Sequence, residues 1–204
     1  SKTYVTALTA SFKDKIRLST PVTGVKREKE AVVVSSAQGE ERYDAVFFAC
    51  HSDQALRLLE QPTASEQQVL GAIKYQENEV LLHTDASILP KRKTAWAAWN
   101  YHLLENDQGQ VPVTYNMNIL QGLDSDQTFC VTLNNSNAID QTKVLKRLQY
   151  HHPIYTQESV AAQARQSEIN TDRLYFCGAY WRYGFHEDGV VSALNAIEKF
   201  KRDL

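Results

Sequence analysis

Apolar residues near the start of the chain follow two different periods. Tyr4, Leu8 and Phe12 recur four residues apart, which predicts one face of a short helix. The segments that follow are rich in valine and phenylalanine and are separated by charged residues or turns, a pattern typical of strands. We expect strands at Ile16–Leu18, Val22–Lys26, Ala31–Ser35, Glu41–Tyr43 and Ala45–Ala49. The last of these is apolar on both faces, as expected of a strand that is covered on both sides.

Two helices are predicted next by residues that cap helix N-termini. Ser52 is suited to cap a helix over 53–59. Ser65 with Gln68 three residues later has the spacing of a capping box, and the helix that it starts is expected to end at Ile73.

From Glu79 onward the pattern changes to short apolar or alternating segments separated by turn-rich linkers. Strands are expected at Val80–His83, Thr94–His102, Val113–Ile119 and Phe129–Leu133. No helix long enough for a parallel crossover lies between them, which favours an antiparallel sheet. Asn137 or Asp140 is then expected to cap a helix that continues through Leu148.

The last third of the chain resembles the first. A helix is expected over Ser159–Gln166, followed by a strand over Arg173–Gly178. After a loop, Asp188-Gly189 opens a helix whose apolar residues recur at helical spacing. These residues are Val190, Val191, Leu194, Ile197 and Phe200. We therefore expect an α+β fold with two lobes: residues 1–61 and 151–204 form a mixed sheet and helix lobe, and residues 62–150 form an inserted antiparallel-sheet lobe with flanking helices.

Composition excludes several classes of protein. The 204 residues carry 22 basic and 24 acidic side chains, so the chain lacks the excess positive charge of a general nucleic-acid binder. No apolar segment approaches the roughly 20 residues that span a bilayer, and the first residues show no secretory pattern. The odd number of cysteines at wide spacing indicates reduced thiols, and we expect a cytoplasmic protein.

Glycine is scarce, and its positions limit how a nucleotide could be held. No two of the eight glycines are separated by a single residue, so the chain contains neither a GxGxxG nor a GxxxxGK[ST] loop. A nucleotide bound by this chain alone would have to be held without a glycine turn around its phosphates.

The segment from Gly178 to Gly189 is the strongest candidate for a site. A glycine after a strand lets another group approach the backbone, and a helix that starts near Asp188 offers free N–H groups to an electron-rich oxygen. The intervening residues include Tyr180, Trp181, Tyr183 and Phe185, which suit a flat heterocycle. An ordinary aromatic loop whose helix is capped by an aspartate is an equally good interpretation.

The other reactive residue types form no recognisable site. The six histidines show no spacing typical of a metal site, and no nucleophile, acid or base can be identified. Trp96, Trp99 and Tyr101 are expected on one face of a sheet, as core residues or, alternatively, as the lining of a cavity.

Several segments resemble the flavin-containing amine oxidase superfamily, which includes monoamine oxidases, protoporphyrinogen oxidase and phytoene desaturases. They are Pro21–Val25, Tyr43–Ala49, Arg173–Gly178 and Glu187–Val191, and the resemblance to the bacterial branch of predicted NAD/FAD-binding proteins extends over 82–101 and 178–189. In that family an N-terminal βαβ unit with GxGxxG holds the FAD pyrophosphate. The resemblance therefore implies a C-terminal fragment that lacks this unit, binds FAD weakly or not at all by itself, and has the missing N-terminal dinucleotide-binding half as its partner.

The resemblance also implies roles for particular residues. Val22 would contact the adenine through its backbone, Gly178 and Ala179 would face the flavin and its ribityl chain, and the start of the last helix would point its N–H groups at the flavin N1/C2 oxygen. The residues at that helix start are Glu187, Asp188, Gly189 and Val190. Which of the two carboxylates corresponds to the family's acidic residue is left open.

The function implied is hydride transfer from an amine or another C–H donor to flavin, in which the cofactor supplies the chemistry. The middle sheet would cover the small-molecule substrate, with Trp96, Trp99, Tyr101, Tyr180 and Trp181 as lining residues, and no metal is expected. The alternative is a non-catalytic module that binds an apolar ligand or a partner peptide between sheet and helices.

Overall fold

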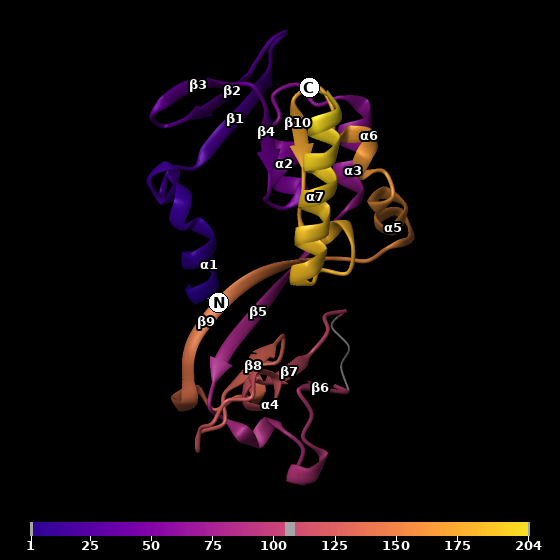
Figure 1. The fold of residues 1–204 in the computed structure, drawn as a ribbon. Helices are drawn as coiled ribbons and strands as arrows, with labels where there is room; N and C mark the ends of the chain where they lie inside the picture. The colour runs from indigo at the N-terminus through magenta and orange to yellow at the C-terminus, as the bar shows by residue number, and fades with distance from the viewer. Residues whose placement is uncertain (1, 105–108, 204) are drawn as a thin grey trace. The chain divides into compact units, whose positions relative to one another are not determined.

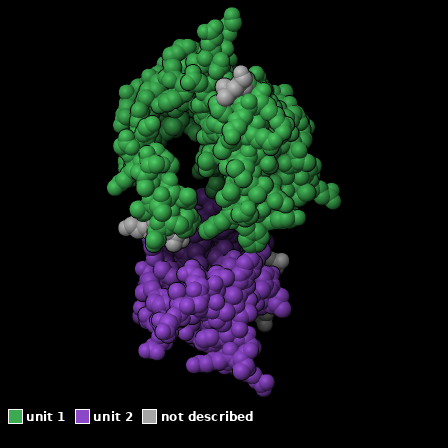
Figure 2. Space-filling model, viewed as in Figure 1, with its two compact units in different colours: residues 1–74, 155–204 green, residues 75–154 purple. Residues whose placement is uncertain are grey.

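The computed structural model describes residues 2–104 and 109–203. The chain forms two compact units: residues 1–74 with 155–204, and residues 75–154 (Figure 2). Residues 151–154, expected in the outer lobe, lie in the second unit. Residues 62–74, expected in the middle lobe, lie in the first unit. They do so because helix α3 (Ala64–Ala72) packs against α2 (Ser52–Leu58) and α5 (Gln157–Gln163) of that unit.

The first unit begins with helix α1 (Lys2–Thr9) and the 3-10 helix η1 (Ala10–Lys15) (Figure 1). The predicted strand at Ile16–Leu18 is not formed: these residues follow η1 directly, and Leu18 is exposed. The predicted helical face also remains in solvent, since Tyr4, Leu8 and Phe12 are all exposed. The four-residue spacing therefore predicted the helix correctly around Tyr4 and Leu8, but Phe12 lies beyond its end, in η1, with non-helical backbone angles.

Two separate sheets follow in this unit. Strands β1 (Val22–Arg27), β2 (Val32–Ser36) and β3 (Gly39–Tyr43) form an antiparallel sheet in sequence order. Strands β4 (Val46–Phe48) and β10 (Leu174–Phe176) come from opposite ends of the chain and pair in parallel. This pairing is what brings the two outer segments into one unit.

Helix α7 (His186–Asp203) covers the parallel pair. Tyr175, Cys177 and Ala196 form a buried cluster with Phe200 against it. Phe48 and Phe176 stack with their ring centroids 5.0 Å apart. The prediction that the first of these strands is covered on both sides is only partly correct, because Phe47 is 39% exposed. The unit is completed by α6 (Gln166–Ile169) and the 3-10 helix η6 (Ala179–Trp181).

The helix starts differ from prediction by one or two residues. His51, and not Ser52, is the N-cap of α2. The capping box of α3 is formed by Thr63 and Glu66: Thr63 Oγ1 accepts from the Glu66 N–H at 3.1 Å, and Glu66 Oε2 accepts from the Thr63 N–H at 2.7 Å. A glutamate makes this pair the better match to the capping-box pattern.

The second unit is built on a five-stranded antiparallel sheet with strand order β6-β7-β8-β5-β9. Its strands are β5 (Tyr75–His83), β6 (Trp99–Tyr101), β7 (Val113–Asn116), β8 (Cys130–Leu133) and β9 (Val144–Pro153). Its short helices are η2 (Ala86–Ile88), η3 (Lys93–Ala95), α4 (Met117–Gln121), η4 (Ser136–Ala138) and η5 (Gln141–Lys143).

The predicted helix from Asn137 or Asp140 through Leu148 is wrong. Asp140 caps only η5, and the residues from Val144 onward form β9, which pairs with β5 along its length. The spacing of the apolar residues in this segment fits both a helix and a strand, and pairing with a long neighbouring strand selects the strand. The strand predicted over 113–119 is also too long, because the Asn116 side chain accepts from two N–H groups and starts α4.

Candidate functional site

The loop between β10 and α7 is held by its own side chains. A Cβ at Gly178 would lie 2.4 Å from Tyr180 Cε1, so the space beside this glycine is filled by a ring of the same chain. The Gly178 N–H donates to Ser192 Oγ at 2.9 Å. Gln163 Nε2 donates to the carbonyls of Tyr180 and Arg182 and ties the loop to α5. The glycine is thus required for packing within the loop.

Asp188 closes the start of α7 against this loop. Its carboxylate is buried and accepts the N–H groups of Tyr183 at 3.2 Å and Phe185 at 3.0 Å. Glu187, in contrast, is exposed. The two candidate carboxylates therefore have different environments: Asp188 holds the chain's own backbone, and Glu187 is accessible.

The helix begins two residues earlier than predicted, at His186. The amides of Asp188 and Gly189 donate to the Phe185 carbonyl at 3.0 and 3.3 Å, and the Val190 amide lies within the helical ladder. Among the described residues, the amides at this helix end that have no such partner belong to His186 and Glu187. These are the groups available to an external electron-rich atom.

The aromatic residues of the loop divide into two pairs. Tyr180 and Trp181 are 5% and 3% exposed and pack against each other inside the first unit. The Trp181 indole Nε1 is buried without a hydrogen-bond partner in the described part of the chain. Tyr183 and Phe185 are exposed beside the start of α7. A flat ligand at this helix end would therefore meet Tyr183 and Phe185.

The aromatic residues of the second unit lie on an open face of its sheet. Trp99 and Tyr101 are 55% and 61% exposed, so the default expectation that they are core residues is wrong. The rings of Trp99 and Tyr115 meet edge to face with centroids 5.3 Å apart. Trp96 lies apart from them, where its Nε1 donates to the Pro90 carbonyl at 2.8 Å.

The opposite face of the same sheet is buried and unexpectedly polar. His83, Thr114, Asn116 and Thr132 are almost completely buried there. This group was not predicted from the sequence. The alternation of threonines with apolar residues along two neighbouring strands is the pattern that indicates it.

Val22 is exposed at the start of β1, beside a hollow of about 630 Å³. Arg17 and Glu41, which also line it, form an ion pair on this surface. Val22 is therefore accessible to a ligand, and it lies in the first unit together with Gly178 and Ala179.

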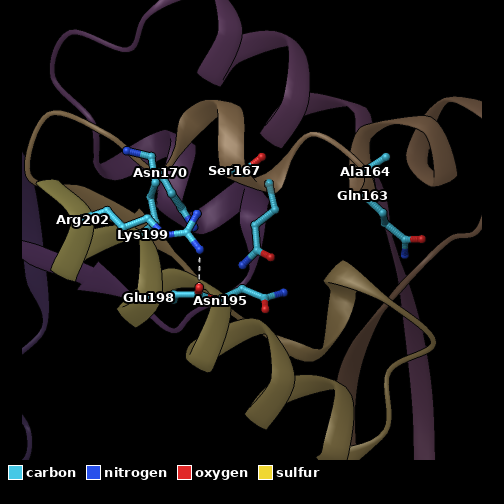
Figure 3. A pocket seen from close by; sticks show the side chains of 9 residues that line it. Gln163, Ala164, Ser167, Asn170, Asn195, Glu198, Lys199 and Arg202 are labelled. Carbon is cyan, nitrogen blue, oxygen red and sulfur yellow. Dashed lines mark hydrogen bonds and ion pairs between the residues drawn. The ribbon is translucent and has the colours of Figure 1, made fainter.

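A second hollow, of about 310 Å³, separates α7 from α5 and α6 (Figure 3). Apart from Ala164 and Ser167, its lining side chains are amides or charged groups, and its arginine, Arg202, is paired with Glu198. Gln166, which also lines it, already donates to the carbonyls of Phe176 and Ser192. This hollow shows that the flank of α7 facing α5 and α6 is polar.

The described residues contain no group of three or more His, Cys, Asp or Glu side chains that could hold a metal ion.

Burial raises the pKa of Cys50 and Cys177, and it raises the pKa of Cys130 to about 11. Thiols with raised pKa values are poor nucleophiles at neutral pH.

Among the helices described, none is both long and apolar enough to span a bilayer.

The structure resembles solved oxidases of about twice its length. A protein of Exiguobacterium sp. 255-15, provisionally classed as a protoporphyrinogen oxidase, matches with a TM-score of 0.65 and 15% identity over 93% of this chain and 48% of its own. Cyclohexylamine oxidase of Brevibacterium oxydans IH-35A matches with a TM-score of 0.57 and 13% identity over 94% of this chain and 51% of its own. Putrescine oxidase bound to putrescine matches with a TM-score of 0.60 and 11% identity over 95% of this chain and 51% of its own.

These matches show a common fold, and the chain spans about half the length of the proteins that it matches. The expectation of an α+β, amine-oxidase-like fold is thereby confirmed. No protein-family model and no curated protein matches the sequence.

Proposed function

We propose that this chain is the C-terminal half of an FAD-dependent oxidoreductase, which supplies the flavin-facing loop and the substrate-side sheet for hydride transfer from an amine or another C–H donor. The observation that carries the proposal is the open edge of strand β4, in a fold that matches half of several oxidases.

Only one edge of the parallel pair can accept another strand. On the outer side of β10, the Phe176 N–H donates to Asn170 Oδ1 at 2.7 Å and the Phe176 carbonyl accepts from Gln166 Nε2 at 2.9 Å. The backbone of Phe47 on β4 points away from β10 by strand alternation, and no strand in the described part of the chain pairs with that side. A two-stranded sheet with one capped edge and one open edge is suited to continue at the open one.

Helix α7 also carries an exposed row of apolar side chains. Val190, Leu194 and Ile197 follow helical spacing and are all exposed, whereas the flank facing α5 and α6 is polar. Phe47 contacts Phe200 of α7 edge to face, which places the open edge of β4 beside this helix. A strand added to β4 and a helix packed on the apolar flank together describe a partner with the form of a βαβ unit.

The first unit presents the groups that such a cofactor site would need. The exposed N–H groups of His186 and Glu187 would face the flavin, and Val22, Gly178 and Ala179 would line it, with Asp188, Gly189 and Val190 setting the position of the helix end. FAD, when bound, accepts the hydride. The positive end of α7 would then stabilise the negative charge of the reduced ring.

The open aromatic face of the second unit supplies the substrate side of this proposal. Trp99, Tyr101 and Tyr115 offer apolar rings with polar edges, which suit an organic substrate oxidised at a C–H bond. Tyr180 and Trp181 are buried, and we assign them to the support of the flavin-facing loop.

The same aromatic face also favours the alternative, a non-catalytic module that binds an apolar ligand. A replacement at Gly178 in the full-length protein separates the two. Gly178→Val forces the Tyr180 ring away, so the flavoprotein should lose its FAD, while a module that binds at the sheet should keep its ligand. Gly71→Ala is the matched control, because a Cβ there makes an ordinary contact of 3.7 Å with Leu56. Unchanged flavin content in Gly178→Val would contradict the proposal.

A further inference from the structure

Four buried or half-buried side chains in the second unit form an unbroken row across the sheet. His83 Nε2 lies 2.7 Å from Thr132 Oγ1, Thr132 Oγ1 lies 2.7 Å from Thr114 Oγ1, and Thr114 Oγ1 lies 2.8 Å from His102 Nε2. The row runs from β5 through β8 and β7 to the residue after β6. We call it the histidine–threonine chain.

One backbone group sets the direction of these hydrogen bonds. The Asp85 N–H donates to His83 Nδ1 at 3.1 Å, so Nδ1 carries no proton and Nε2 must carry one. His83 therefore donates to Thr132, and the buried Thr132 hydroxyl finds its acceptor in Thr114. Thr114 in turn donates to His102, whose Nε2 must be unprotonated. Any other direction leaves a buried hydroxyl without an acceptor.

We infer that the histidine–threonine chain is a one-way hydrogen-bond chain that fastens the edge strand β6 to the sheet and loosens when His102 is protonated. β6 spans only Trp99–Tyr101 and pairs with β7 alone, so a side-chain anchor next to it contributes a large share of its attachment. Protonated His102 would donate to Thr114, reverse that hydroxyl, and leave the Thr132 proton without an acceptor.

The surroundings of the two histidines agree with neutral rings. Burial lowers the pKa of both His83 and His102. The charged group nearest His83 is Asp85, which pairs with Lys143 and accepts a hydrogen bond from the Asp140 N–H. On the neighbouring strand β8, Cys130 lies directly opposite His83. Among the described residues no charged side chain forms an ion pair with His102. The backbone N–H of His102 donates to the Pro112 carbonyl.

The ring nitrogens of the full 204-residue chain can be observed directly by 15N NMR at neutral pH. His83 should carry its proton on Nε2 and His102 on Nδ1. In Thr114→Val, His102 should lose this fixed tautomer and its pKa should rise toward the 6.5 of free histidine, while His83 stays unchanged. Thr114→Ser should restore the wild-type pattern, and Thr94→Val on the exposed η3 is the matched control.

Hydrogen exchange tests the attachment of β6. The amides of β6 should exchange about tenfold faster in Thr114→Val, a size typical of one lost hydrogen bond, whereas those shared by β5 and β8 should not change. A proton on His102 Nε2 in the wild-type chain, or a His102 signal and β6 exchange rate that do not respond to Thr114→Val, would overturn the inference.

Discussion

At the scale of single residues, the loop between β10 and α7 is held in place by hydrogen bonds and packing among its own groups and those of α7. Gly178 leaves space for Tyr180, Ser192 accepts from Gly178, and Asp188 accepts two loop amides. A loop fixed in this way needs no ligand to hold its shape, so it can present the His186 and Glu187 amides in advance.

Asp188→Ala tests the role of the buried carboxylate in this loop. The change leaves the N–H groups of Tyr183 and Phe185 without their acceptor, which should lower the free energy of unfolding by about 1–3 kcal/mol. Urea denaturation of the chain measures the effect. Asp124→Ala, in an exposed irregular segment, should change stability by less than about 0.5 kcal/mol. An equally small effect of Asp188→Ala would contradict this role of the carboxylate.

At the scale of elements, helix α7 presents two kinds of surface. Ala196 is buried against β10, whereas Leu194, about 200° away around the helix axis, is exposed on the opposite face. An exposed apolar row on a long helix is typical of a surface that another element covers.

Leu194→Asp should therefore leave the unfolding free energy of this chain within about 0.5 kcal/mol of wild type. In the full-length protein the same change should prevent the N-terminal half from packing and reduce the bound flavin. Ala196→Asp is the contrast, because a buried carboxylate should destabilise the chain itself. Full flavin content in the folded Leu194→Asp protein would show that this flank is not covered by the proposed partner.

The buried sheet face gives a second prediction at this scale, in the pH dependence of stability. The pKa values of His83 and His102 are lowered by burial, so the unfolded chain binds protons more readily than the folded one. Their contribution is complete above about pH 6.5 and is lost as the pH falls below that value. Urea unfolding between pH 7 and pH 5 should show this loss, and Thr114→Val should show less of it. A flat profile in wild type would contradict it.

Sequence patterns identified most elements and failed where tertiary contacts decide. The strands around Val46 and Leu174 and the last helix were predicted, because their apolar residues are continuous or clearly periodic. β9 was mistaken for a helix, since Val144 and Leu148 fit both periods and only β5 selects a strand. The sequence predicts a loop between the strand at Leu174 and the last helix, but the burial of Tyr180 and the exposure of Trp99 depend on contacts between distant segments.

At the scale of the whole molecule, we propose that another polypeptide segment completes the fold and the cofactor site. The chain matches about half of each oxidase and leaves β4 with an open edge. It also has no glycine turn for a pyrophosphate. Together these observations, the open edge being that of the described residues, favour a shared cofactor site over a self-sufficient one.

Flavin content measured on two purified proteins, the 204-residue chain alone and the full-length protein encoded with the sequence upstream of Ser1, tests this claim most directly. We predict about one FAD per molecule in the full-length protein and little or none in the chain alone. A full-length protein free of flavin, or one tightly held FAD on the chain by itself, would contradict the account.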